Sequence, residues 1–123
     1  MPTKSEITER LRADPRARAV YFALVEVAMA RGTTTYGDLA ERIGLPRRGP
    51  RMAREVGRLL ELVSLYEACH ARPLLSVVVF STTDRKPGRG FFSLARDLGR
   101  LHEGEDENAF YRFELGAVYH TWS

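Results

Sequence analysis

Apolar residues recur at helical spacing along most of this chain, and turn-forming residues separate the runs. The longest run covers residues 15–31 and is apolar on most sides. It begins at Asp14 followed by Pro15 and ends at Gly32. An aspartate cap followed by a residue without an N–H is a typical helix start, and glycine is a typical helix end. Because a helix that is apolar on most sides is buried, we expect residues 15–31 to lie in the core.

The same pattern predicts two helices joined by a loop in the next part of the chain. Thr35 is a helix cap with Asp38 three residues on, close to a capping box, and this helix covers residues 36–43. After a short loop, Pro50 opens a third helix that runs to residue 69 or 70. Two short helices joined by a short turn, the second one basic, are the outline of a helix-turn-helix.

Strand and wing candidates flank this pair of helices. Residues 33–35 are β-branched and predict a short strand, and residues 74–81 (LLSVVVFS) form the only convincing strand pattern. The turn-rich, basic segment 82–90 has the composition of a wing, the loop beside the recognition helix of winged-helix proteins. Residues 91–98 then suggest a short amphipathic helix.

The two ends of the chain are also expected to be helical. Residues 1–13 form an arm in which Ser5 caps a two-turn helix with its apolar residues inward. Residues 103–123 comprise an acidic linker and a last helix. We therefore predict a single domain over residues 1–123. Its class is α+β, mostly α: a winged helix-turn-helix-like domain with a small sheet and an extra C-terminal helix.

The composition points to an ordered, soluble domain. With 44% hydrophobic residues the chain is too apolar for a disordered protein, and no apolar run approaches the ~18 residues of a membrane span. The N-terminus lacks the apolar stretch of a signal peptide. The one cysteine, Cys69, excludes a disulfide framework and a cysteine-built zinc site. We expect a cytoplasmic protein that needs no cofactor.

The distribution of charge changes this picture more than its total of +3. Of the 19 basic residues, 17 are arginine, whose planar fork suits phosphates and base edges. A genome rich in G and C gives the same enrichment, so only the location of the arginines can argue for a function. Residues 42–58 hold six arginines against one acid, which makes this segment +5. Such an asymmetry is typical of a nucleic-acid surface.

The arginines of the third helix share one face. At ~100° per residue, Arg51, Arg54 and Arg58 lie within about 60° of one another. The apolar residues of this helix cluster on a different face, and they are Met52, Val56, Leu59, Leu60 and Val63. Any exposed helix face is polar, but a face of mixed charge would meet that need equally well. The nearly all-positive face favours DNA binding.

Two stretches in this region, TTTYGDLAERIGLP and AREVGRLL, resemble the winged-helix DNA-binding part of the O6-alkylguanine DNA alkyltransferases and alkyltransferase-like proteins. The resemblance covers about residues 33–60. It implies that Tyr36 presses on a phosphate beside a flipped nucleotide and that Arg54 enters the duplex stack in its place. It also implies that Gly57 lets the helix approach DNA closely.

The chain departs from the alkyltransferases where their chemistry resides. They carry a Pro-Cys-His-Arg nucleophile segment after the recognition helix, and the corresponding stretch here, RPLLSVVVFS, has no cysteine. Cys69 and His70 precede that stretch without a proline, as expected of helix-end packing residues. The longer stretch RPLLSVVVFSTTDRKPGRGFF resembles small uncharacterised bacterial and phage proteins, a resemblance that implies no known chemistry.

Other residues offer no catalytic constellation. The three histidines lie far apart and lack metal-ligand spacing. Asp84 and Lys86 are spaced like a nuclease pair, but no second carboxylate lies on a neighbouring predicted strand. Ser76 has no Gly-x-Ser-x-Gly setting, and no phosphate-binding glycine loop is present. We therefore expect a protein that is not an enzyme and holds no metal.

The sequence thus favours non-catalytic binding of double-stranded DNA, in regulation, in a phage-related pathway or in sensing modified bases. The expected contacts are Tyr36, Arg51, Arg54 and Arg58, with Arg47, Arg48, Lys86 and Arg89 on backbone phosphates. The alternative is an interaction or homodimerisation module built on the aromatic residues of the last helix. These residues are Phe110, Tyr111, Phe113, Tyr119 and Trp122.

Overall fold

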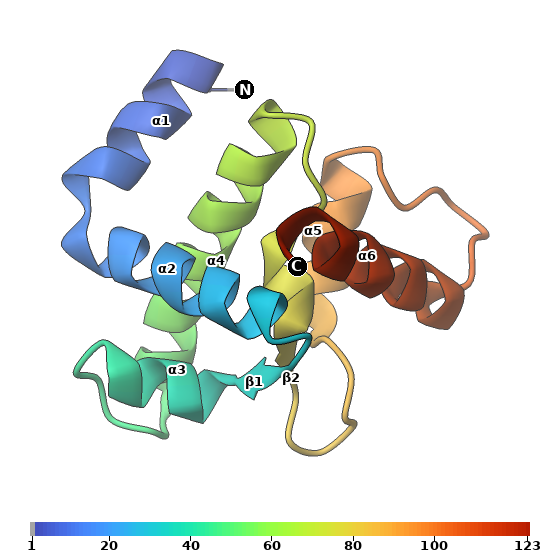
Figure 1. Cartoon of the computed structure of the whole chain (residues 1–123). Coiled ribbons are helices and arrows are strands. Elements are labelled where there is room, and N and C mark those ends of the chain that lie inside the picture. Colours follow the sequence, from blue (N-terminus) through green and yellow to red (C-terminus); the bar gives the residue numbers. More distant parts are fainter. Residues whose placement is uncertain (1) are drawn as a thin grey trace.

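The longest helix, α4, runs through the middle of the molecule, and the other elements pack around it (Figure 1). The structure is a computed structural model that describes residues 2–123. The elements are α1 (Lys4–Ala13), α2 (Pro15–Met29), β1 (Thr34–Thr35), α3 (Tyr36–Arg42), α4 (Pro50–Cys69), the 3-10 turn η1 (Leu75–Val78), β2 (Val79–Phe80), α5 (Arg89–Asp97) and α6 (Glu107–Trp122). The expected class, mostly helical with a small sheet, is confirmed.

The core forms between α4 and its neighbours. All five apolar residues predicted for the inner face of α4 are buried, and α2 adds buried residues that include Val20 and Leu24. η1 lies at the centre of the molecule, where it packs against α2, α4 and α6 (Figure 1). It therefore connects α6 with the helices that come earlier in the chain. No helix within residues 2–123 is both long and apolar enough to cross a membrane.

The predicted helix starts are largely confirmed. The Asp14 carboxylate accepts hydrogen bonds from the N–H groups of residues 16 and 17, and Thr35 Oγ1 accepts one from Asp38. The predicted cap of the first helix is wrong, because Thr3 and not Ser5 caps α1. Thr3 Oγ1 accepts the N–H of Glu6 and donates to its carboxylate, so the helix starts earlier, at Lys4. The inward residues of α1 are Ile7 and Leu11.

The strand predicted for residues 74–81 is mostly wrong. Only Val79–Phe80 form a strand, which pairs in parallel with Thr34–Thr35. The partner strand is two residues long, so the preceding backbone has no edge to pair with and folds as η1 instead. Side chains meet part of its hydrogen-bonding demand. Glu114 accepts the N–H of Leu74 at 2.9 Å, and Ser64 accepts that of Ser76 at 3.4 Å.

The basic loop after β2 closes on itself. Phe80 and Pro87 form an isolated antiparallel bridge, and the Ser81 N–H donates to the Lys86 carbonyl at 2.8 Å. Arg85 has a φ of 54°, in the left-handed region, which turns the chain back towards α5. The segment is therefore a small hairpin-like loop that leads directly into α5, and we call residues 80–88 the basic loop.

Candidate nucleic-acid interface

The turn into α4 is set by Gly49 and Pro50. Gly49 has a φ of 106°, a conformation that favours glycine, and Pro50 occupies the first helical position. Glycine offers no side chain, so the first turn of α4 has no side-chain cap. Arg47 and Arg48 lie just before this turn and Arg51 just after it. The helix start therefore gathers arginines around uncapped amide groups.

The arginines predicted for one face of α4 do share a surface. Arg51, Arg54 and Arg58 line a single shallow hollow together with Arg48 from the preceding loop and Arg16 from α2. We call these five residues the arginine surface. Because Met52 and Val56 face the core, the helical periodicity of α4 directs Arg51, Arg54 and Arg58 towards solvent.

Within the arginine surface, Arg58 and Arg16 are bound to carboxylates. Arg58 donates to Glu55 at 2.8 Å and to Asp14 at 3.0 Å, and Arg16 donates to Glu55 at 3.0 Å. The hydrogen bonds from Arg58 and then Arg16 lower the pKa of Glu55 to about 2. Those with Glu55 and Asp14 raise the pKa of Arg58. Part of the positive charge is therefore neutralised in place.

Arg47 is also paired, although it was expected to reach a phosphate. Its guanidinium donates to Asp38 at 2.6 Å and to Glu41 at 3.0 Å, both on α3. The hydrogen bond from Arg47 lowers the pKa of Asp38. Arg42 binds Glu26 of α2 at 3.1 Å. Carboxylates from α2 and α3 thus offset a charge that looks unopposed in the 42–58 segment taken alone.

Arg48, Arg51 and Arg54 are exposed and form no ion pair with residues 2–123. The three cations of the next basic segment, Arg85, Lys86 and Arg89, also form no ion pair with residues 2–123, and of these Arg85 and Arg89 are exposed while Lys86 is half-buried. Two of these six residues, Arg48 and Arg89, line the opposite walls of a cleft. One wall is formed by residues 35–37 and the start of α4, and the other by residues 80–82 and 88–90. We call it the loop cleft.

Two helices begin at the loop cleft. The N-caps of α4 and α5 are Gly49 and Gly88, both of which line the cleft and neither of which caps its helix with a side chain. Each uncapped N-terminus carries about half a positive charge. With Arg48 and Arg89 also in the walls, the loop cleft has the polarity that attracts anions.

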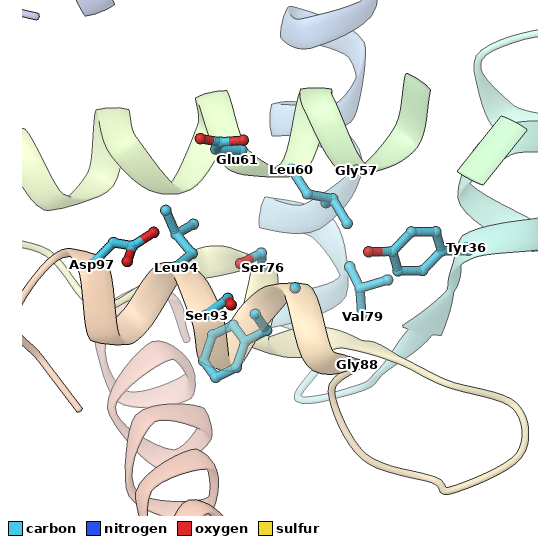
Figure 2. A pocket seen from close by; sticks show the side chains of 12 residues that line it. Tyr36, Gly57, Leu60, Glu61, Ser76, Val79, Gly88, Ser93, Leu94 and Asp97 are labelled. Carbon is cyan, nitrogen blue, oxygen red and sulfur yellow. The ribbon is translucent and has the colours of Figure 1, made fainter. Parts of the chain in front are cut away.

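Tyr36 connects the loop cleft with a second hollow. The latter, which we call the α4–α5 pocket, has a volume of about 250 Å³ and shares Tyr36, Gly88 and Gly90 with the cleft. Figure 2 shows Tyr36 at one end of the pocket and Glu61 and Asp97 at the other. Burial raises the pKa of Tyr36, and its hydroxyl forms no hydrogen bond within the described chain.

The α4–α5 pocket was not predicted, because its residues come from separate elements. One signal was present in the sequence: Gly57 lies in the interior of a helix that has no need of glycine. Its backbone is not left-handed, and a Cβ added there would meet nothing within 4 Å. The resemblance implies that Gly57 lets the helix approach DNA closely, and this stays a prediction; in the structure Gly57 lines the wall of this pocket.

The residues considered for catalysis lie on different elements: Cys69 and His70 at the end of α4, and Ser76 in η1. Cys69 ends α4, half-buried, and His70 bonds the Tyr66 carbonyl through Nδ1 at 2.9 Å. Within residues 2–123, no group of three or more histidine, cysteine or acidic side chains is placed to hold a metal. Ser76 is buried and bonds Ser64.

The aromatic residues of α6 divide between the core and the surface. Tyr119 donates its hydroxyl to the Gly32 carbonyl at 2.6 Å, and Trp122 stacks edge-on with Tyr21. Phe110 and Tyr111 pack against the aromatic residues of α5. Phe113 points outward and is 77% exposed. Only Phe113 of this set is thus an exposed contact candidate.

We compared the chain with known protein families, curated proteins and solved structures. No protein-family model, no curated protein and no solved structure matches the chain.

Proposed function

We propose that this protein binds double-stranded DNA without catalysis, through the start of α4 and the basic loop. The observation that carries the proposal is the position of the unpaired arginines. Arg48, Arg51 and Arg54 remain without a carboxylate partner in residues 2–123, while their neighbours Arg47 and Arg58 are bound to two carboxylates each. Unpaired arginines are free to exchange water and counterions for phosphates.

The loop cleft would hold the phosphate backbone. Arg48 and the start of α4 would contact it from one wall and Arg89 from the other, and Lys86 of the basic loop would contact a phosphate beyond the cleft. The uncapped amide groups at the starts of α4 and α5 offer hydrogen bonds that suit phosphate oxygens. In this arrangement α3 and α4 act as a helix-turn-helix and the basic loop as a small wing. This is the finer classification that we propose for the fold.

Arg51 and Arg54 would then lie nearest the groove. By the resemblance to alkyltransferase-like proteins, Tyr36 would press on a phosphate and Arg54 would enter the stack beside a flipped nucleotide. Tyr36 lines the loop cleft, which supports the first role, while its hydroxyl points into the α4–α5 pocket (Figure 2). The absence of an ion pair on Arg54 within the described chain supports the second. Arg47 and Arg58 become secondary contacts, since both must leave a carboxylate first.

The proposal is tested by titrating a labelled duplex at several salt concentrations. We expect the logarithm of the affinity to fall with the logarithm of salt concentration by about 0.9 per phosphate contact. The double variant Arg51→Glu, Arg54→Glu should lose binding and keep its fold. A matched control is Arg10→Glu, Arg12→Glu, which reverses two exposed arginines on α1. Equal losses in the two double variants would reject this surface.

Dimerisation remains the second candidate, because Phe113 leaves a large apolar side chain in solvent. Light scattering separates the two functions. A stable dimer that Phe113→Ser dissociates, together with no retention of duplex by the wild type, would favour the interaction module over DNA binding.

A further inference from the structure

We propose that the α4–α5 pocket binds a small organic cation, a molecule with a flat apolar body and an amino or amidino group at one end. The pocket lies between α4, α5 and η1, and its residues are distinct from the cations of the arginine surface. The inference rests on the size of the pocket, its charge and the room that Gly57 leaves.

The size and walls of the pocket fit a small flat molecule. Its volume of about 250 Å³ lies just below the range of drug-sized sites. A pocket of this volume suits a ligand of about ten non-hydrogen atoms. Leu60, Val79, Phe91 and Leu94 supply apolar side chains to its walls. Most small-molecule sites combine such walls with a few polar groups that orient the ligand.

The charge of the pocket selects a cation. Glu61 from α4 and Asp97 from α5 lie at the same end (Figure 2). Neither forms an ion pair with residues 2–123, and no lysine, arginine or histidine is among the residues that line the pocket. Both residues are exposed, so they lie where the pocket meets solvent, and a charged N–H donor on a ligand that enters the pocket would pair with them.

The room in the pocket depends on Gly57. In the interior of a helix, glycine is less favourable than alanine by roughly 0.5–1 kcal/mol. Here neither the backbone conformation nor a close neighbour calls for glycine. A side chain at this position would occupy the pocket, so glycine at position 57 keeps it open at the expense of helix stability.

Ser76 adds a polar group in the middle of the pocket. It is 5% exposed, and its Oγ receives a hydrogen bond of 2.7 Å from Ser64 Oγ. Ser64 in turn accepts the N–H of Ser76. The Ser76 hydroxyl therefore gives a bound ligand one polar contact among the apolar side chains of the wall.

A ligand in this pocket would also touch the proposed DNA site. Tyr36, Gly88 and Gly90 belong to both the pocket and the loop cleft. The ligand would therefore act as an effector that changes the affinity for DNA, a step that rests on the proposed function. The ligand site itself does not depend on it.

The experiment uses benzamidinium as the probe and benzamide as its neutral counterpart of nearly the same shape. In an NMR titration of the full chain without DNA, we expect saturable shifts at the pocket residues, with a Kd of about 1 mM for benzamidinium. Benzamide should bind at least about tenfold more weakly. Equal binding of the two probes, or no saturable shift with either, would overturn the proposal. Because no DNA is present, such a failure leaves the proposed function untouched.

Two pairs of variants locate the binding. Glu61→Gln, Asp97→Asn should weaken benzamidinium at least about tenfold, whereas Glu9→Gln, Glu103→Gln, which removes two exposed charges elsewhere, should not. Gly57→Leu should abolish binding by filling the pocket. Gly116→Leu is its control, because Gly116 also lies within a helix with open space at its Cβ. Undiminished binding in Gly57→Leu, with its fold intact, would place the probe elsewhere and reject the proposal.

Discussion

Arg58 of α4 binds Asp14, which precedes it by 44 residues, with 3.0 Å between Nη2 and Oδ2. The same carboxylate caps α2 by accepting the N–H groups of residues 16 and 17. Although partial burial opposes the shift, the bonds from the Ala17 N–H and from Arg58 lower the pKa of Asp14.

Arg58→Ala should therefore affect stability more clearly than DNA binding. Exposed ion pairs contribute up to about 1 kcal/mol, and we expect a loss of about that size in urea unfolding. Duplex affinity should fall less than in Arg54→Ala, because Arg54 has no carboxylate to leave. If Arg58→Ala weakens binding as much as Arg54→Ala at unchanged stability, the division between paired and unpaired arginines is wrong.

Glu55→Gln should raise the affinity for DNA. Glu55 holds both Arg58 and Arg16, and it is the one acidic residue within the arginine surface hollow. Neutralising Glu55 removes its repulsion of the DNA phosphates and releases the guanidinium groups of Arg58 and Arg16. We expect tighter binding by about 0.5–1 kcal/mol, with a steeper dependence on salt. A duplex titration at two salt concentrations measures both. Weaker binding would mean that Glu55 orients the arginines rather than occupying them.

The pairing of Glu55 also predicts an acid dependence of stability. The pKa of Glu55 is lowered from 4.5 to about 2 in the folded protein, first by Arg58 and then by Arg16. A group with a lowered folded pKa stabilises the fold above its ordinary pKa, and this contribution is lost as the pH falls from 4.5 towards 2. Urea unfolding between these pH values should therefore show a shallower decline in Glu55→Gln than in the wild type. Glu103→Gln, which changes an unpaired residue, should follow the wild-type curve.

Local signals predicted the helices well and the placement of their charges poorly. Asp14 with Pro15, and Thr35 with Asp38, act within one turn, so their chemistry is visible in neighbouring letters. Asp14, one of the two partners of Arg58, is 44 residues away, and Glu26, the partner of Arg42, is 16 residues away, so neither pair is visible in a short stretch of sequence. Arg51, Arg54 and Arg58 do share a surface, but carboxylates that include Asp14 neutralise part of its positive charge.

The errors in the sheet have a similar origin. Residues 74–81 have strand propensity along their whole length, yet only Val79–Phe80 find a partner, because β1 offers two residues. Strand propensity describes a fit to a sheet surface, and it has no effect where no sheet edge exists. The α4–α5 pocket escaped prediction for the same reason. Gly57, Ser76 and Asp97 meet only through the packing of α4, η1 and α5.

Gly57→Ala should stabilise the protein. It replaces glycine in a helix interior where the new methyl group meets nothing within 4 Å, so a gain of about 0.5–1 kcal/mol is expected in chemical unfolding. Gly116→Ala should give a similar gain for the same reason. Gly44→Ala is the opposite control, because Gly44 has a φ of 79° and alanine there is strained. Destabilisation by Gly57→Ala would show that the helix requires glycine at this position.

The buried carboxylate Glu67 carries the largest single-residue prediction. It is fully buried on α4 and accepts two hydrogen bonds of 2.9 Å from Arg72 and one of 2.7 Å from the Tyr21 hydroxyl. The Arg72 guanidinium also lies near the rings of Tyr66 and Trp122, which ties α2, α4 and α6 together. Burial, and then the bond to Glu67 and its charge, raise the pKa of Tyr21.

Removing only the cation should therefore be costly. Arg72→Ala leaves the Glu67 carboxylate in the core with Tyr21 as its remaining partner, and we expect a loss of about 3 kcal/mol or more in urea unfolding. The double variant Glu67→Leu, Arg72→Leu removes both charges and replaces them with apolar side chains. It should lose less than Arg72→Ala alone, because no charge is left unpaired. If the double variant is the less stable of the two, the ion pair stabilises the fold beyond the cost of burying its charges, and the energetic role assigned here to Arg72 is too small.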